Sequence, residues 1–244
     1  MKHLMDVGFE FEVGSPWTMK TTVRKIREDL GISGLTPQVD VTVETNAKYN
    51  GEISTPVWPL AKGMSNLRRI FKWFEKNGIV TNDSCGFHVS LSFRRKELNW
   101  MLDIDRLVLS FNEEKWLKLC KRVNNSYTGC YIDSLICEAG KKVFKTEAIR
   151  DQWVADKIIE LGEDRFSSVN IEHLEEDSPY VEYRVLGGTG YHLRYGTMIN
   201  GVIDMAANMK RALPNARGTA LRGLKLKECF KVKGMNYMVS IVPH

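Results

Sequence analysis

The stretch Val7-Gly8-Phe9-Glu10-Phe11-Glu12-Val13 decides the fold of this chain. Apolar and polar residues alternate along it, and a period of two is typical of a β-strand with one buried face. The apolar side chains then face a core, whereas Glu10 and Glu12 share the opposite face with their Cα atoms roughly 7 Å apart. Two carboxylates at this spacing can each bind a divalent cation or share a pair of cations. The same pattern also fits a strand whose glutamates only contact water.

Three further stretches, residues 51–57, 86–93 and 180–186, are expected to be strands, and their polar side chains include ligand groups. These side chains are Glu52, His88, Ser90, Glu182 and Arg184. Carboxylates and imidazoles ligate divalent cations, and a guanidinium can hold phosphate oxygens in a bidentate manner. Taken singly, each motif also fits a surface glutamate, a hydrogen-bonded histidine or an ion pair within one strand. Their joint occurrence in this order favours one shared site.

The remaining sequence predicts helices and shorter strands around these four stretches. We expect helices at residues 18–30, 60–77, 146–161 and 195–213, with one or two more across 97–123. Alternation at 39–44 predicts another strand that exposes Asp40 on its polar face, 167–172 predicts a short strand, and 124–140 is interpreted as an irregular loop over the site. Strands joined without a regular β-α-β repeat predict an α+β fold with a mainly antiparallel sheet and helices packed on one face.

The composition fits one globular domain that spans residues 1–244. The charged fraction of 27% excludes a disordered or collagen-like chain. Apolar runs stay well short of the roughly 20 residues of a membrane span. The acidic residue Asp6 lies too close to the N-terminus for a signal peptide. The five cysteines contain no Cys-x-x-Cys pair, which favours reduced thiols and a cytoplasmic location.

The chain is mildly basic, because 35 Lys and Arg residues against 30 Asp and Glu residues leave a formal charge of +5. Much of this excess lies in the C-terminal extension, about residues 215–244, where aromatic residues are interleaved with the cations. Such a segment can contact the phosphates of a nucleic acid, although it also fits a helix face that only contacts water. The charge therefore allows nucleic acid as a partner without indicating it.

The motif order resembles that of the amidoligases, which belong to the carboxylate–amine ligase superfamily together with glutamine synthetase and glutamate–cysteine ligase. The matching segments are Glu10-x-Glu12, Glu52-Ile-Ser-Thr-Pro-Val57, Cys85-Gly-Phe-His88-Val and Val181-Glu182-Tyr-Arg184. The resemblance covers residues 7–209, which is most of the chain. It implies a glutamine-synthetase-like catalytic domain, with a curved antiparallel sheet whose concave face holds ATP and two or more Mg²⁺ or Mn²⁺ ions.

The resemblance also implies an activity and a set of site residues. The activity is ATP-dependent ligation of a carboxylate to an amine through an acyl-phosphate, with small molecules or peptides as substrates. The implied metal ligands are Glu10, Glu12, Glu52, His88 and Glu182. Arg184 and Glu52 are the implied catalytic groups, and Arg184 contacts the nucleotide phosphates. Further nucleotide or substrate contacts are implied for Arg165, Asn170, Ser90 and Asp40.

One position departs from the family pattern. The usual His-x-His motif has Ser90 in place of its second histidine, which puts the reaction rate or the substrate in question. Two other functions stay open: a metal-dependent phosphoesterase or nuclease that uses the same acidic face, and a binding protein that has lost catalysis. We expect a compact chain of this kind in the cytoplasm of a bacterium, or of the host if a phage encodes it.

Overall fold

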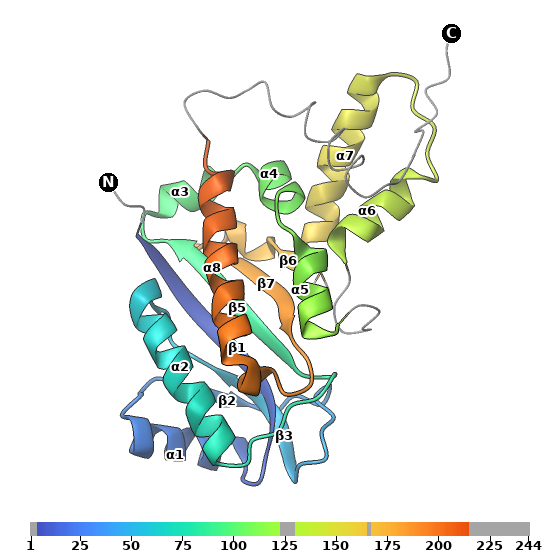
Figure 1. The fold of residues 1–244 in the computed structure, drawn as a ribbon. Helices are drawn as coiled ribbons and strands as arrows, with labels where there is room; N and C mark the ends of the chain where they lie inside the picture. The colour runs from blue at the N-terminus through green and yellow to red at the C-terminus, as the bar shows by residue number, and fades with distance from the viewer. Residues whose placement is uncertain (1–3, 123–129, 165–166, 215–244) are drawn as a thin grey trace.

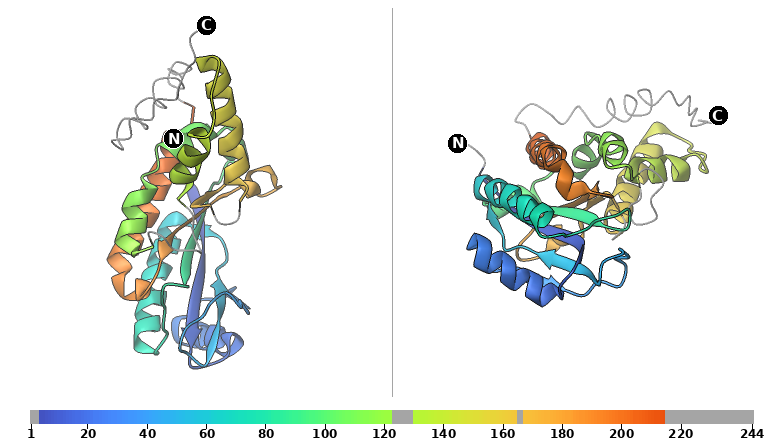
Figure 2. Two further views of the ribbon diagram at one scale, coloured as in Figure 1. Left: turned by 90° about the vertical axis from the view of Figure 1, so that its right-hand side faces the viewer. Right: turned by 60° about the horizontal axis from the view of Figure 1, so that its bottom comes forward.

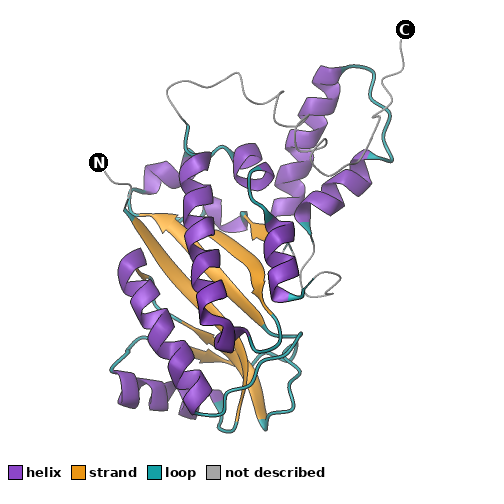
Figure 3. Ribbon diagram, in the orientation of Figure 1, coloured by secondary structure: helices purple, strands orange, loops and turns teal. Residues whose placement is uncertain are grey.

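The computed structural model describes residues 4–122, 130–164 and 167–214. Within them the chain forms a seven-stranded antiparallel sheet and eight α-helices, which confirms the predicted α+β class (Figures 1 and 3). The strands are β1 (Met5–Ser15), β2 (Thr36–Gln38), β3 (Tyr49–Ser54), β4 (Trp58–Pro59), β5 (Gly86–Phe93), β6 (Val169–Asn170) and β7 (Val181–Gly187). The α-helices are α1 (Met19–Leu30), α2 (Leu60–Lys76), α3 (Lys96–Trp100), α4 (Ile104–Leu109), α5 (Glu113–Cys120), α6 (Tyr131–Ala139), α7 (Glu147–Gly162) and α8 (Tyr195–Ala212). Two 3₁₀-helices are η1 (Glu172–Glu175) and η2 (Tyr191–Arg194). No helix among these residues is long and apolar enough to cross a membrane.

The first strand lies at the centre of the sheet. The strand order is β2-β3-β1-β5-β7-β6, and β4 pairs with the beginning of β1. The register places Glu10 beside His88, Glu12 beside Glu52, and Ser90 beside Glu182. Because side chains alternate across a sheet, these residues all project from the same face. The alternation read from the sequence therefore places the predicted ligands together.

The opposite face of the sheet is covered by helices. Figure 2 (left) shows α2, α5 and α8 on one side of the strands. The core between them is aromatic: the Phe11 and Phe87 rings stack with centroids 5.4 Å apart, and Phe71 from α2 meets Phe87 edge-on at 5.4 Å. Burial of each such side chain contributes about 2–3 kcal/mol to folding. This core holds the central strands in place, so the polar face has a rigid support.

A second apolar cluster lies where α4, α6 and α7 pack on one another, on the side of the sheet that ends in β6 (Figure 1). Val108, Leu135 and Ile158 are fully buried in it. The prediction of an irregular loop over residues 124–140 is wrong for 131–139, because these residues form α6; residues 123–129 lie outside the described part. The expectation of one or two helices across 97–123 is also corrected, since three short helices occupy this stretch.

The strand predicted at residues 39–44 does not form. Asp40 instead begins a tight turn, in which its Oδ1 accepts hydrogen bonds from the Thr42 backbone N–H at 2.8 Å and the Thr42 hydroxyl at 2.7 Å. A side chain that binds its own backbone two residues on competes with strand pairing. The side chains of Val39 and Val41 are exposed as a result, and only Val43 enters the core.

His192 gives the fold a pH dependence that can be measured. It is only 5% exposed, its ring meets Phe74 edge-on, and burial lowers its pKa to about 4. The unfolded chain therefore binds more protons between pH 6.5 and pH 4, so stability is lost as the pH falls through this range. From pH 7 to pH 5 this one group should cost about 2 kcal/mol of unfolding free energy. Urea unfolding should show a correspondingly weaker pH dependence for His192→Gln, and an unchanged dependence would contradict the assignment.

Candidate functional site

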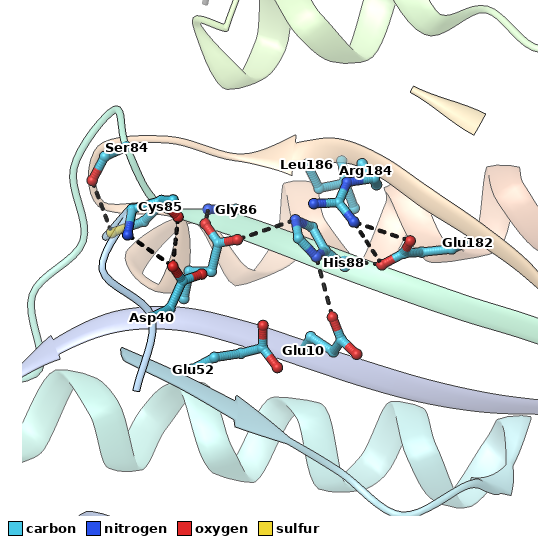
Figure 4. A network of polar contacts seen from close by, with 12 residues as sticks. Glu10, Asp40, Glu52, Ser84, Cys85, Gly86, His88, Glu182, Arg184 and Leu186 are labelled. Carbon is cyan, nitrogen blue, oxygen red and sulfur yellow. Dashed lines mark hydrogen bonds and ion pairs between the residues drawn. The ribbon is translucent and has the colours of Figure 1, made fainter. Parts of the chain in front are cut away.

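The polar face of the sheet gathers ionisable side chains from four adjacent strands (Figure 4). They are Glu10 and Glu12 from β1, Glu52 from β3, His88 from β5, and Glu182 and Arg184 from β7. His88 lies at their centre and is 4% exposed. Its Nδ1 is 3.3 Å from Oε2 of Glu10 and 3.4 Å from Oε1 of Glu182, and its Nε2 is 3.4 Å from Oε1 of Glu12. Four of the five predicted ligands thus form one contiguous group around His88.

The ligand atoms divide into two sets of three. One set takes an atom each from Glu10, His88 and Glu182, the other from Glu12, Asp40 and Glu52, and within each set the atoms lie within 4.8 Å of one another. Asp40 joins the second set from its turn rather than from a strand. Carboxylate oxygens with a single imidazole are the donors that Mg²⁺ and Mn²⁺ accept in proteins. The residues present therefore fit two neighbouring divalent cations.

Gly86 makes the close contact between β5 and the first strand possible. A Cβ at this position would lie 2.4 Å from Nε2 of His88 and 3.0 Å from Oε2 of Glu12, so no larger residue fits. In its place the Gly86 backbone N–H donates a hydrogen bond to Oε2 of Glu12. This bond fixes one oxygen of a carboxylate that is only 7% exposed and leaves the other facing His88.

The charges of the group are not balanced. Burial alone lowers the pKa of His88, but the hydrogen bond with Glu10 and the charges of Glu12 and Glu182 outweigh it and raise the pKa. Burial alone raises the pKa of Glu10, and His88 then brings it below its ordinary value. The pKa of Glu52 is raised by burial and by repulsion from Glu10. The carboxylates thus exceed the cations available to them, which is the electrostatic condition for binding added cations.

Arg184 lies at the edge of this group beside Glu182. Its Nη1 donates to both carboxylate oxygens of Glu182, at 3.2 and 3.1 Å. The side chain of Arg184 is 21% exposed. A guanidinium is a group that can hold phosphate oxygens in a bidentate manner.

The other predicted contact residues have mixed positions. Ser90 projects from the same face and pairs with Glu182 across β5 and β7. Asn170 also pairs with Glu182, from β6, but it is buried and its Oδ1 accepts a hydrogen bond from the Glu172 backbone N–H at 2.9 Å. Arg165 and the basic C-terminal extension lie outside the described residues. The predicted roles of all these residues stay predictions.

Arg122 is a buried cation that the sequence patterns did not indicate. The pairing of β5 with β7 shifts register here, so that Arg184 and Val185 together oppose His88. Such a bulge leaves backbone groups outside the regular ladder. Arg122, only 1% exposed, donates from Nη1 to the carbonyl oxygens of Arg184 (3.2 Å) and Leu186. It thereby fixes the backbone from which the Arg184 side chain projects. Only the fold reveals this role, because nothing near residue 122 in the sequence matches a site motif.

Replacing Arg122 with methionine should destabilise the protein and misplace Arg184. Two buried carbonyl oxygens lose their donor, which costs about 2–3 kcal/mol of unfolding free energy. Urea unfolding measures the free energy of unfolding. The reaction rate per folded molecule is measured well below the melting temperature. We expect turnover to fall about tenfold in the methionine variant and to recover in part with Arg122→Lys. Full turnover by folded Arg122→Met would show that the residue only stabilises the fold.

Comparison with known proteins adds one match. A family model described as "Putative amidoligase enzyme" matches residues 25–192, which is more than half of the chain. The matched region contains Glu52, His88, Glu182 and Arg184, whereas Glu10 and Glu12 on β1 precede it. No curated protein matches the chain. The matched region and the site geometry concern the same face of the sheet.

Proposed function

The chain belongs to the amidoligase family, and we propose that it is an ATP-dependent ligase that joins a carboxylate to an amine through an acyl-phosphate. One observation carries the proposal most: two adjacent sets of cation-ligating atoms share a rigid sheet face with an arginine. An acidic surface patch alone would not need Arg184 held beside Glu182. The likeness to glutamine synthetase stays a prediction from the resemblance.

The proposed reaction balances in two steps. A carboxylate oxygen of the first substrate attacks the γ-phosphorus of ATP, the bond to the β-phosphate oxygen breaks, and ADP leaves. The amine nitrogen of the second substrate then attacks the acyl carbon, inorganic phosphate leaves, and the nitrogen loses a proton to give the amide. The first step removes the main chemical obstacle, because phosphate is a far better leaving group than the oxygen of a free carboxylate.

The carboxylates and His88 would hold two divalent cations. When bound, these cations would neutralise the repulsion between the triphosphate and the substrate carboxylate, and they would stabilise the charge that develops in phosphoryl transfer. The ligands come from neighbouring strands, and strands hold side chains in fixed positions more accurately than loops do. Asp40 is the exception, since it reaches the second set from a turn.

Arg184 would hold the transferred phosphoryl group. Glu182 accepts hydrogen bonds from Nη1 of this arginine, so the side chain is oriented before the substrate binds. Glu52, the other predicted catalytic residue, has a raised pKa and belongs to the second ligand set. In the proposal it acts as a cation ligand, and a bound cation would favour its charged form.

Release of ADP and phosphate tests the proposal directly. The purified protein is incubated with ATP, Mg²⁺ or Mn²⁺ and mixtures of candidate carboxylates and amines, and products are identified by mass spectrometry. We expect ADP to form only when both kinds of substrate are present, with an amide of the summed mass less one water. A protein that binds no ATP with Mg²⁺ and instead cleaves phosphodiesters would establish the phosphoesterase alternative.

A further inference from the structure

A cavity of about 500 Å³ opens beside the acidic site. Its floor is the face of β1 and β5 that carries the site, and Glu10 belongs both to the site and to the cavity lining. From Glu10 the floor continues along β1 over Gly8 to Asp6, a distance of about 13 Å at the usual rise per residue. The floor is low at Gly8, which has no side chain. The cavity is therefore an elongated pocket that leads to the proposed reaction centre.

The walls of the cavity are largely apolar between its two ends. Val57, Pro179 and Tyr180 line it with apolar groups. Hydroxyl side chains are interspersed among them, from Ser54, Thr55, Ser90, Ser92 and Ser178. The Tyr180 ring is held in place by His173, which stacks on it with ring centroids 4.3 Å apart and an interplanar angle of 13°. Cavities of this volume take organic molecules of several carbon atoms, and a molecule as small as ammonia needs no such space.

The charges of the lining favour a cationic occupant. The two lining cations already have protein partners: Arg94 Nε binds Asp6 at 2.8 Å, and Lys96 Nζ donates to the Asp177 carbonyl oxygen. Three carboxylates, Asp6, Glu10 and Glu176, line the cavity against these two cations, and Glu10 and Glu176 also contact His88 and His173.

We propose that this cavity binds the amine substrate, and that this substrate is an organic primary amine with an apolar stem rather than ammonia. The inference rests on the proposed ligase function. The ammonium lies at the end of the cavity next to the cation site, where its nitrogen reaches the acyl carbon after losing a proton, and the stem lies along the walls. A nucleotide fits the cavity less well, because its phosphates would find both lining cations engaged.

Two probes of equal length and opposite charge test the proposal. Binding of 1,6-diaminohexane and of hexanedioate to the full chain is measured by calorimetry, with Mg²⁺ and a non-hydrolysable ATP analogue measured in parallel. We expect the diamine to bind at least about tenfold more tightly than the dicarboxylate. Tighter binding of hexanedioate, or no binding of either probe, would overturn the assignment of the amine.

A pair of glycine substitutions locates the binding. A Cβ at Gly8 would meet the Ser90 Cβ at an ordinary 3.7 Å, so Gly8→Leu fills the cavity without forcing the backbone. The matched control is Gly196→Leu on α8, where a Cβ meets nothing within 4 Å. We expect only Gly8→Leu to weaken diamine binding, at least tenfold, while both variants keep the affinity for the ATP analogue. Loss of the ATP analogue from Gly8→Leu alone would mean that the cavity holds the nucleotide.

A charge reversal keeps the test valid if the leucine variant does not fold. The side chain of Glu176 is 54% exposed, so the fold should tolerate Glu176→Lys. This variant should weaken the diamine and strengthen hexanedioate, and unchanged affinities would overturn the proposal. A wild-type protein that binds the diamine in this cavity but binds no ATP would refute the proposed ligase function while leaving the amine site standing, so the two failures are distinguishable.

Discussion

Arg184→Ala is expected to lower ATP turnover about 10³-fold while the protein stays folded. Glu182 holds Nη1 of the guanidinium at 3.1–3.2 Å, and the side chain projects from the face that would hold the nucleotide. Its loss removes a fixed positive charge at the point where charge moves in phosphoryl transfer. The fold should tolerate the change, because Glu182 keeps a second partner in His88 at 3.4 Å. Steady-state ADP release and thermal melting give the two measurements.

A conservative variant and a control separate this role from a structural one. Arg184→Lys keeps the charge but loses the planar set of donors, so an intermediate turnover is expected. Arg24→Ala on α1 removes an arginine whose side chain is 66% exposed and should leave turnover unchanged. If Arg184→Ala retains full turnover in folded protein, the arginine is no phosphate ligand and the ion pair with Glu182 is merely structural.

The residues of the polar face could be predicted from the sequence, because the alternation of side chains is a local property of each strand. A period of two fixes which side chains share a face, whatever lies next to the strand. The pairing of β1 with β5 then brings Glu10 beside His88 over a separation of 78 residues, and no pattern in the sequence specifies that register. It was the order of the motifs, through the family resemblance, that indicated one common site.

The features that escaped prediction depend on contacts between distant segments. The bulge opposite His88 exists in the pairing of two strands, and Arg122 stabilises it from the end of α5. The turn at Asp40 also escaped, because valines alternate with polar residues there just as in a strand. The hydrogen bonds of Asp40 to Thr42 outweigh that alternation, and they place the carboxylate next to Glu12 and Glu52. The misread stretch is therefore the one that completes the second ligand set.

Glu12→Gln should abolish cation-dependent stabilisation as well as turnover. Glu12 belongs to the second ligand set, and glutamine keeps its shape and can still accept the Gly86 hydrogen bond. In the absence of divalent cations the stability of the variant should be close to that of the wild type, because the repulsion of Glu52 and the attraction of His88 by this carboxylate are lost together. Added Mg²⁺ or Mn²⁺ should raise the melting temperature of the wild type and not that of the variant. Turnover should fall at least about 10²-fold.

The matched control is Glu28→Gln, which removes a carboxylate that is 62% exposed on α1 and pairs only weakly with Arg24 at 3.9 Å. It should melt like the wild type at every cation concentration. Together the two variants separate a ligand from a surface charge. Loss of a ligand removes the response to cations, whereas loss of a structural glutamate lowers stability and leaves that response in place. Glu12→Gln protein that is destabilised without cations but still stabilised by Mg²⁺ would therefore contradict the two-cation site.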